Sequence, residues 1–414
     1  MADFTLSPAQ RSLFLAAAKK FGTPLYLYDQ QVIQDRCRRL QAAIPYPKLK
    51  LLYAMKANSN PAIIKTIHGE GFGIDSVSLG EVLLARKAGV PGRDILFTNN
   101  NVGDNELEGA AKAGATLNID SLEVLARQPK GRRVFVRING PVGAGHHDHC
   151  ITGGPTSKFG VAWELIPEVL KTAQRRGVKI VGVHQHIGSG ILDASRFFTA
   201  IDVLTQALRT HRFPDLEAID FGGGIGIPYR PTENHVDLTA LGKGIAGRFQ
   251  EFCRHIGREL TLMIEPGRFL VAESGYLLSR ATVIKPTPYD RTFAGIDTGF
   301  NHLVRPTMYG SYHHITNLSR PNGPEKTQLI AGNICETGDI FTRRDDNNGA
   351  EPRRLPEVYT GDILCFHCAG AYGFAMSSEY NTRPRPAEAI LNGKKLTLIR
   401  KRKSFEQLVA EITK

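Results

Sequence analysis

The sequence predicts an α/β protein built from a (β/α)8 barrel and a second domain rich in β-strands. From about residue 48, short apolar runs rich in β-branched residues alternate with helix-like segments. This alternation is typical of parallel strands joined by right-handed crossover helices. Eight such runs occur before Gly275, and eight units favour a closed barrel. An open, doubly wound parallel sheet is the alternative.

The eight predicted strands are short and apolar, and most are followed by a turn or a helix-like segment. They span residues 49–54, 73–77, 94–98, 115–119, 134–138, 179–186, 216–221 and 260–265. Apolar residues recur with helical spacing between them, and these segments include residues 78–87, 121–127, 163–176 and 194–210.

After Gly275 the pattern changes to strand-like runs separated by Gly, Pro and Asn turns. These runs span residues 276–284, 292–296, 327–330, 362–366 and 395–400. They predict an all-β domain, with which the extended segment 23–29 could pair. The polar segment 343–356 is typical of a surface loop. We therefore expect a barrel over residues 30–273 and a β-sandwich or Greek-key domain assembled from residues 1–29 and 274–414.

Composition narrows the functional class. The 414 residues carry a net charge of +12, with 42% hydrophobic and 22% charged residues, which is ordinary for a globular protein and excludes disorder. No apolar run approaches the ~18 residues of a membrane span, and the N-terminus lacks a secretory signal, so we expect a cytoplasmic protein without membrane contact. The basic segment 394–403 alternates with leucines, which favours a solvated strand face over a nucleic-acid site.

The number and spacing of the cysteines give little support for a zinc site or a disulfide scaffold. Six cysteines in this length are too few for a disulfide scaffold. Cys365 and Cys368 form one C-x-x-C pair, but they lie in an apolar, strand-like run. We therefore expect a strand there and no zinc site.

A lysine follows the first predicted strand. Lys56 stands in the segment Tyr53-Ala-Met-Lys-Ala, at the end of the barrel where active sites are found. A lysine that is desolvated at this position can act as a nucleophile and form a Schiff base. Taken alone, Lys56 could also be an ordinary surface lysine.

Glycines gather after the seventh predicted strand, at residues 222–224 and 226. Successive glycines allow backbone N–H groups to approach phosphate oxygens, and the loops after strands 7 and 8 are the usual phosphate site of such barrels. A tight turn without a ligand is the alternative.

Two histidines end the sixth predicted strand. His184 and His186 are two residues apart and project from one face. They could hold a metal if the His146-His147-Asp148-His149-Cys150 cluster supplied further ligands. Alternatively, His186 stacks on a planar ring and Ser189 donates to its phosphate. We favour the ring and predict no metal.

A carboxylate follows the eighth predicted strand, in Glu265-Pro-Gly-Arg268. Beside a pyridine ring, Glu265 would keep the ring nitrogen protonated and strengthen its pull on electrons. It could instead be a buried structural partner of Arg268. A lysine, a glycine loop, a stackable histidine and a carboxylate, all at strand ends, together predict pyridoxal 5'-phosphate (PLP).

Several motifs resemble the fold-type III PLP-dependent decarboxylases, the group that acts on ornithine, diaminopimelate or arginine. The resemblance runs from about residue 20 to the C-terminus. It implies a barrel of the alanine-racemase type plus a C-terminal all-β domain that completes the active site. The motifs are residues 53–57, 76–81, 186–189, 222–224, 265–268, 299–310, 335–339, 370–372 and 376–384.

The resemblance also implies roles for single residues. Lys56 would carry PLP and His186 would stack on its ring, while Glu265 would pair with the ring nitrogen. The other cofactor contacts would be Ser189, Gly223, Gly224, Gly267, Arg268 and Tyr372. An arginine guanidinium can donate two parallel hydrogen bonds to a carboxylate. The substrate contacts would be Arg268, Arg305, Tyr309, Glu336 and Tyr372.

Cys335 and Glu336 indicate the type of decarboxylase and its assembly. In this family, the partner subunit supplies the corresponding cysteine and glutamate to each active site. The resemblance therefore implies a homodimer with shared active sites. Cys335 would donate a proton, and Glu336 would hold a distal ammonium. The run Cys-Glu-Thr-Gly-Asp339 resembles the diaminopimelate type, which converts meso-2,6-diaminopimelate to L-lysine and CO2. Two positions differ from the family pattern: His302 stands where an Asp is expected, and Glu379 where an Asn is expected. These differences keep D-lysine, D-ornithine or another basic amino acid as alternative substrates.

Three other classes remain alternatives at this point. An alanine-racemase-like enzyme would share the barrel and PLP, but Glu265 argues against it because racemases place an arginine there. A metal-dependent barrel hydrolase would need a zinc centre. A non-catalytic PLP carrier would be a single barrel, so the long C-terminal domain argues against it.

Overall fold

The computed structural model describes residues 3–145, 152–154, 157–288, 291–344 and 349–413. Its internal contacts divide the chain into two compact units. The barrel unit comprises Gln34–Ile227 and His235–Leu270, and the β unit comprises Met1–Ile33, Pro228–Asn234 and Val271–Lys414.

Eight parallel strands form the barrel unit, so the predicted closed barrel is confirmed and the open sheet is wrong. The circle closes because β10 pairs with β2 and β5 pairs with β6. A short strand, β7 (Val161–Ala162), adds to the end of β6. The eight strands are β2 (Leu49–Ala54), β3 (Gly73–Ser76), β4 (Ile95–Thr98), β5 (Thr116–Ile119), β6 (Arg133–Asn139), β8 (Lys179–His184), β9 (Ala218–Asp220) and β10 (Thr261–Ile264).

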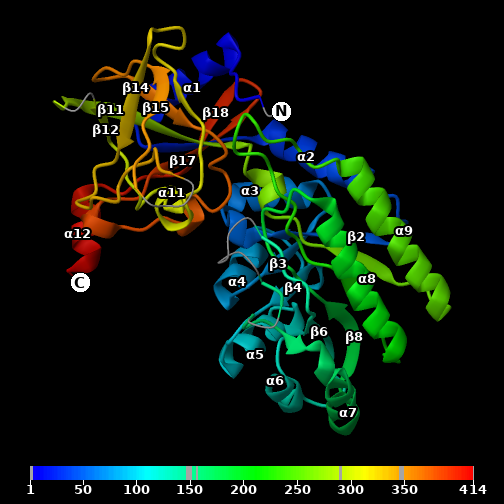
Figure 1. The fold of residues 1–414 in the computed structure, drawn as a ribbon. Helices are drawn as coiled ribbons and strands as arrows, with labels where there is room; N and C mark the ends of the chain where they lie inside the picture. Colours follow the sequence, from blue (N-terminus) through cyan, green and yellow to red (C-terminus); the bar gives the residue numbers. More distant parts are fainter. Residues whose placement is uncertain (1–2, 146–151, 155–156, 289–290, 345–348, 414) are drawn as a thin grey trace. The chain divides into compact units, whose positions relative to one another are not determined.

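Helices connect these strands and lie around the outside of the barrel (Figure 1). Side chains at the preceding residue cap several of them: Ser78 and Ser121 accept backbone N–H groups of α4 and α6, and Asp193 and Asp237 those of α8 and α9. The connecting helices are α3 (Pro61–Gly69), α4 (Leu79–Lys87), α5 (Asp104–Lys112), α6 (Leu122–Arg127), α7 (Ile166–Arg176), α8 (Ala194–Thr210) and α9 (Leu238–Ile256), while α2 (Gln30–Ala43) precedes β2 and α10 (Arg268–Val271) follows β10.

Apolar side chains from six strands fill the barrel interior. The buried cluster consists of Leu52, Leu96, Phe135, Val181, Ala218 and Met263. Gly182 on β8 makes room for the Phe135 ring, because a Cβ at Gly182 would lie 2.2 Å from that ring. The interior is therefore packed, and polar chemistry is confined to the strand ends.

The β unit is built on nine strands. The main path runs β15-β14-β12-β11-β1-β17-β18, and β16 pairs with both β11 and β13. The N-terminal strand β1 pairs antiparallel with β11 and parallel with β17, which confirms the expected pairing of segment 23–29. The strands are β1 (Leu25–Asp29), β11 (Gly275–Pro286), β12 (Thr292–Ile296), β13 (Ile315–Asn317), β14 (Glu325–Ala331), β15 (Arg353–Pro356), β16 (Ile363–Phe366), β17 (Ala387–Asn392) and β18 (Lys395–Arg400).

One expectation for this unit is wrong. Residues 343–356 are not all loop, because β15 forms at the edge of the sheet, where polar side chains can face solvent. The unit is mostly strand, as expected, and it also contains α1 (Pro8–Phe21), α11 (Arg305–Tyr309) and α12 (Phe405–Ile412). Helix α1 begins with a capping box between Ser7 and Gln10, a short-range signal that the sequence pattern contains.

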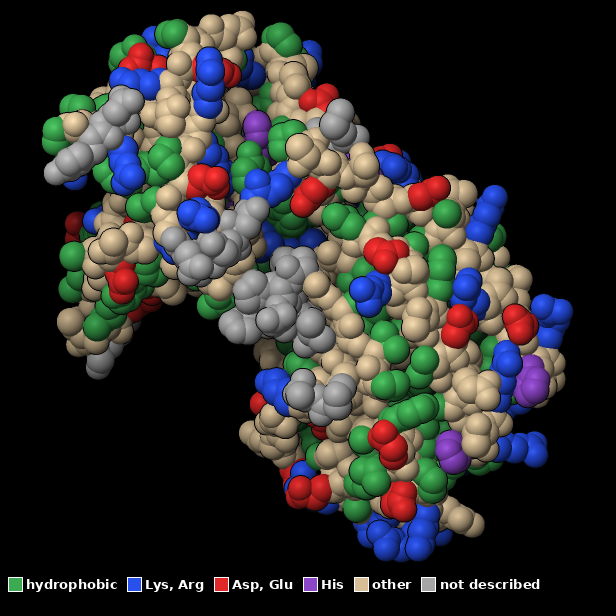
Figure 2. Space-filling model, in the orientation of Figure 1, with side chains coloured by type: hydrophobic (Ala, Val, Ile, Leu, Met, Phe, Trp, Pro, Cys, Tyr) green, Lys and Arg blue, Asp and Glu red, His purple; other side chains and the backbone are tan. Residues whose placement is uncertain are grey.

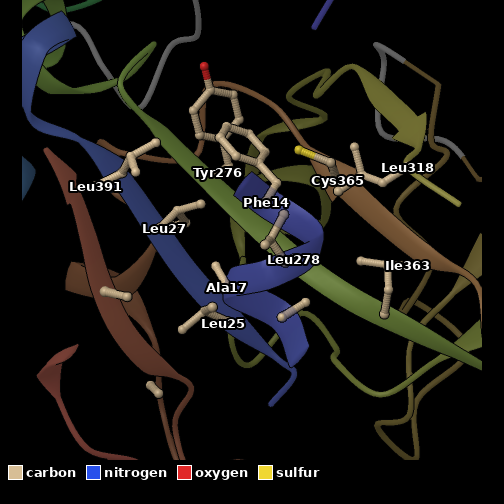
Figure 3. Close-up of a cluster of buried hydrophobic side chains, with 13 residues drawn as sticks. Phe14, Ala17, Leu25, Leu27, Tyr276, Leu278, Leu318, Ile363, Cys365 and Leu391 are labelled. Atoms are coloured by element: carbon tan, nitrogen blue, oxygen red, sulfur yellow. The ribbon is translucent and has the colours of Figure 1, made fainter. Parts of the chain in front are cut away.

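Helix α1 packs on the sheet and forms the core of the β unit (Figure 3). Phe14 and Ala17 of α1 contact the same cluster as Leu27 of β1 and Leu278 of β11. Cys365 of β16 is fully buried in this cluster, which confirms that the C-x-x-C segment begins as a strand. No helix among the described residues is long and apolar enough to cross a membrane.

Candidate active site

Lys56 lies in the single helical turn that follows β2. Its Nζ atom is 3.7 Å from Oδ2 of Asp75, the third residue of β3. Burial, and then the charge of Glu265, raise the pKa of Asp75 to about 7, although Lys56 acts in the opposite direction. The Lys56 side chain is only partly exposed and lies beside a buried carboxyl group, so it is not an ordinary surface lysine.

Glu265 follows β10 and is almost completely buried. Its partner is His184 at the end of β8, not Arg268: His184 Nε2 is 3.1 Å from Glu265 Oε2. Burial lowers the pKa of His184, so the neutral ring can donate this hydrogen bond. Burial alone would raise the pKa of Glu265, but contact with His184 and the charge of Lys56 lower it to about 2. Glu265 is therefore an ionised carboxylate.

The glycine loop after β9 has no room for side chains. A Cβ at Gly223 would lie 2.0 Å from the Glu265 carbonyl oxygen, and one at Gly224 would lie 2.6 Å from the Gly188 oxygen. Gly222 and Gly224 also have φ of +68° and +113°, which favour glycine. The loop is thus packed by its backbone against the segments that follow β8 and β10.

His186 is held by the glycine loop. Its Nδ1 accepts the Gly223 N–H at 3.0 Å, and burial lowers the pKa of the ring well below its ordinary value. The neutral ring therefore has a fixed orientation next to the loop predicted to bind phosphate.

Arg268 begins α10 and donates to the Ser189 hydroxyl, with Nη2 at 3.1 Å. The neighbouring Gly267 lies close to the turn that holds Lys56, because a Cβ there would be 3.2 Å from Ala54 Cβ and 3.3 Å from Ala57 Cβ. The structure thus brings together Lys56, His186, Ser189, Gly223, Gly224, Glu265, Gly267 and Arg268 at the ends of the barrel strands.

Three further ionisable side chains of this site were not singled out from the sequence. Asp75 lies beside Lys56, Asp220 ends β9, and Arg137 of β6 is buried and donates to the His186 carbonyl at 3.4 Å. Burial lowers the pKa of Arg137 to about 10. The available signal was a charged residue inside or directly after an apolar strand run.

The β unit carries the other predicted site residues. Cys335 and Glu336 are exposed on a short loop. Asp339 holds this loop, because its buried carboxylate accepts the backbone N–H groups of Phe300 at 2.6 Å and Ile334 at 2.7 Å. The Cys335 N–H donates to Asn381 Oδ1 at 2.9 Å. The motif from Cys335 to Asp339 therefore presents a thiol and a carboxylate on a rigid turn.

Arg305 is the first residue of α11 and is almost fully buried. Its guanidinium lies over the Tyr229 ring at 4.5 Å and contacts His313 Nε2 at 3.1 Å. Tyr309 ends the same helix and is half-buried. Tyr372 is also half-buried and has a φ of +55°, a strained value for a bulky residue.

The two departures from the family pattern lie in the β unit. His302 is buried, with Nδ1 2.8 Å from the Thr298 hydroxyl, and Glu379 pairs with Lys403 at 3.0 Å. The His146–Cys150 cluster lies outside the described residues.

Comparison with known proteins identifies the family. The family described as pyridoxal-dependent decarboxylase, pyridoxal binding domain, matches residues 30–272. A diaminopimelate decarboxylase from Methanothermobacter thermautotrophicus is 45% identical over 403 residues, which cover 95% of this chain and 92% of the relative. The chain belongs to the diaminopimelate decarboxylase family. An Escherichia coli member is 38% identical and covers 94% of each chain.

Solved structures of the family share the fold. One diaminopimelate decarboxylase aligns with a TM-score of 0.89 at 36% identity over 96% of both chains. The Helicobacter pylori enzyme complexed with L-lysine aligns with a TM-score of 0.87 at 32% identity, covering 97% of this chain and 99% of that one. A Vibrio vulnificus lysine/ornithine decarboxylase, at 23% identity and a TM-score of 0.80 over 94% of this chain and 99% of that one, shows the fold alone.

This protein is therefore a PLP-dependent decarboxylase, and PLP is its cofactor. The comparisons lend no support to the racemase-like enzyme, the metal-dependent hydrolase or the PLP carrier.

Proposed function

We propose that this enzyme decarboxylates meso-2,6-diaminopimelate to L-lysine and CO2, the last step of lysine biosynthesis. The observation that carries the proposal is the likeness over nearly the whole chain to diaminopimelate decarboxylases, one of them solved with L-lysine. That likeness includes the β unit with its loop from Cys335 to Asp339. No comparison supports D-lysine or D-ornithine as the substrate.

The residues at the barrel strand ends fit PLP. Lys56 offers a partly exposed amine for the cofactor aldehyde, and Glu265 offers an ionised carboxylate for a protonated ring nitrogen. The glycine loop has no side chains to cover its backbone, and Gly224 is partly exposed at the strand ends. When bound, PLP supplies an electron-withdrawing ring that takes up the electron pair left behind as CO2 departs.

Each barrel residue would contribute through a property of its own. Lys56 would hold the cofactor, and Asp75 beside it would exchange protons with its amine. Glu265 would keep a proton on the ring nitrogen. His186, oriented by the Gly223 N–H, would lie against the ring face. The phosphate would be bound by Ser189, Gly223, Gly224, Gly267, Arg268 and Tyr372.

The substrate would be bound largely by residues of the β unit. Arg268, Arg305, Tyr309 and Tyr372 would bind its carboxylates, for which guanidinium groups form paired hydrogen bonds. Glu336 would hold the distal ammonium. Cys335 would deliver a proton to the carbon that has lost CO2, a role for which an exposed thiol on a rigid loop is suited.

We further propose that the enzyme is a homodimer in which Cys335 and Glu336 of each subunit serve the barrel of the partner subunit. The exposure of both side chains supports this assignment. A cytoplasmic location stays a prediction.

Replacing Lys56 by Ala tests the proposed function. We expect the wild-type protein to show a visible absorbance band from bound PLP and to release CO2 from meso-diaminopimelate. K56A should lose both the band and turnover, because it lacks the amine that holds the cofactor. The measurements are the absorbance spectrum and the amounts of CO2 and L-lysine, with L-lysine, D-lysine and L-ornithine as comparison substrates.

Lys50 on the preceding strand, β2, provides a matched control. Its amine is bound at the surface by the Arg93 carbonyl and Asp94, so K50A should keep the band and the activity. An active K56A, or a wild-type protein that prefers another substrate, would contradict the proposal.

A further inference from the structure

Three buried ionisable side chains gather at the ends of three adjacent barrel strands. His184 ends β8, Asp220 ends β9, and Glu265 follows β10. One nitrogen or oxygen atom of each lies within 4.8 Å of the others. The exposed fractions of the three residues are 0%, 0% and 2%. The roles proposed above use Glu265 but leave His184 and Asp220 without any.

We propose that His184 and Asp220 are positioning residues for PLP: His184 keeps Glu265 ionised and oriented, and Asp220, carrying a proton, links Glu265 to the glycine loop. This inference rests on the proposed role of Glu265 at the ring nitrogen.

His184 acts on Glu265 through one hydrogen bond. The strand register places His184 opposite Asp220, and its Nε2 lies 3.1 Å from Glu265 Oε2. The ring is buried and neutral, and its Nδ1 has no hydrogen-bond partner among the described residues, so the ring proton belongs on Nε2. A donor at this distance favours the charged form of a carboxylate.

Asp220 is the member of this cluster that carries a proton. Its Oδ1 accepts the Gly222 N–H at 2.8 Å, whereas its buried Oδ2 accepts no hydrogen bond from the described residues. Two buried carboxyl groups side by side cannot both be ionised at low cost. His184 and the charge of Lys56 stabilise the ionised form of Glu265, so Asp220 is the carboxyl group that is protonated. Burial, and then the charge of Glu265, raise the pKa of Asp220 well above its ordinary value.

A protonated Asp220 connects two parts of the cofactor site. Its acceptor oxygen holds the Gly222 N–H, and its hydroxyl can donate to Glu265. The Gly222 carbonyl in turn accepts the Glu265 N–H at 2.8 Å, and the next residue, Gly223, orients His186. The ring-nitrogen carboxylate, the stacking ring and the phosphate loop therefore form one rigid assembly.

Replacing Asp220 by Asn and by Ala tests the proton assignment. An Asn amide has the shape of a protonated carboxyl and keeps one acceptor and one donor. D220N should therefore bind PLP within about twofold of the wild-type Kd, whereas D220A should bind about tenfold or more weakly. The readout is the Kd of PLP for apoprotein, from absorbance titration, with unfolding of each apoprotein as a folding check. If D220N weakens binding as much as D220A, Asp220 is ionised and the proposal falls.

Replacing His184 by Gln and by Phe tests the contact with Glu265. Gln keeps an N–H donor near the position of Nε2, and Phe removes it. In H184F the absorbance of bound PLP should depend on pH differently from that of the wild type, because the ring nitrogen is no longer held by a fixed carboxylate; H184Q should restore the wild-type profile. Identical profiles in H184F and wild type would overturn the role of His184.

These outcomes are distinct from a failure of the proposed function. A wild-type protein without a PLP band would reject the cofactor site as a whole. A wild-type protein with normal PLP binding, together with equal effects of D220N and D220A or an unchanged H184F profile, would reject only the positioning roles.

Discussion

The candidate site depends on charged side chains that the barrel buries beside one another. Asp75, Asp220 and Glu265 are three buried carboxyl groups, and the charges of Lys56 and Arg137 act on Asp75 and Glu265. Burial raises the pKa values of Asp75 and Asp220, while Glu265 stays ionised because His184 and Lys56 stabilise its charge. Proton positions in this site are thus set by neighbours and not by residue type.

A buried histidine in the β unit makes stability depend on pH. Burial, with the charges of Arg402 and Arg383, lowers the pKa of His302 to about 4. The unfolded chain binds this proton near pH 6.5, so the unfolded state gains protons first as the pH falls. The stability associated with neutral His302 is present above pH 6.5 and is lost as the pH falls towards 4.

The substitution H302N should remove this dependence. We expect the free energy of unfolding of the wild type to fall by on the order of 3 kcal/mol more than that of H302N between pH 6.5 and 4. Denaturant unfolding at a series of pH values measures the difference. The exposed His255 provides the control: the free energy of unfolding of H255N should fall as much as that of the wild type over this range. Parallel curves for H302N and wild type would contradict the expectation.

At the scale of elements, the β unit is organised around strand β1, which joins β11 and β17. This strand comes from the N-terminus, and its partners come from residues 275–286 and 387–392. Four consecutive residues, Leu25–Tyr28, are completely buried, so both faces of the strand are covered. A central strand of this kind gives a continuous apolar signal in the sequence.

Truncating Leu278 tests how far the unit depends on its core. Leu278 lies on β11, is fully buried and pairs with Leu25 of β1. L278A should lower the free energy of unfolding by about 2–5 kcal/mol, from lost apolar burial and the cavity left behind. Val283 on the same strand is 40% exposed, so V283A should cost less than about 1 kcal/mol. Equal losses in the two variants, measured by denaturant unfolding, would argue against this core.

At the scale of the whole molecule, the positive charge is spread over the surface. In Figure 2, Lys and Arg side chains are distributed over the visible face, with Asp and Glu among them. Many of them form exposed pairs, such as Arg127 with Glu123 and Arg354 with Glu325. The basic segment 394–403 contains β18, which pairs with β17, as the strand interpretation predicted.

The proposed homodimer makes a prediction about mixed assemblies. K56A and C335A should each be nearly inactive alone. If one site combines Lys56 of one subunit with Cys335 of the other, random mixing gives half mixed dimers, each with one intact site. An equimolar mixture should then recover about a quarter of wild-type activity after subunit exchange.

Mass measurement in solution provides the accompanying check. The mixture should contain dimers, and two samples of the same variant mixed together should stay inactive. Full-length dimers that show no recovery after verified exchange would place Lys56 and Cys335 of one subunit in the same site and contradict the proposal.

Much of the fold could be predicted because the barrel strands are buried on both sides. Continuous apolar runs marked all eight strands to within about two residues at most ends. The short strands β7 and β13, the edge strand β15 and the buried strand β17 were missed. Polar residues at a sheet edge carry no such signal, and in β17 the buried Glu388 interrupts the apolar run. The motifs named most residues of the candidate site, but Asp75 and Arg137 were not singled out, because a charged residue in a strand run does not show which other charges it will meet in the fold.

The amino-acid sequence was enough to predict the alternation of strands and helices, the candidate residues for PLP chemistry and the family. These depend on local periodicity and on motifs whose members are close together in the chain. The tertiary structure alone decided that Glu265 pairs with His184 instead of Arg268, that Asp75 lies beside Lys56, and that Asp220 lies between Glu265 and the glycine loop. The reason is physical: burial and the approach of distant charges set which groups are ionised, and both arise only when the strand ends meet.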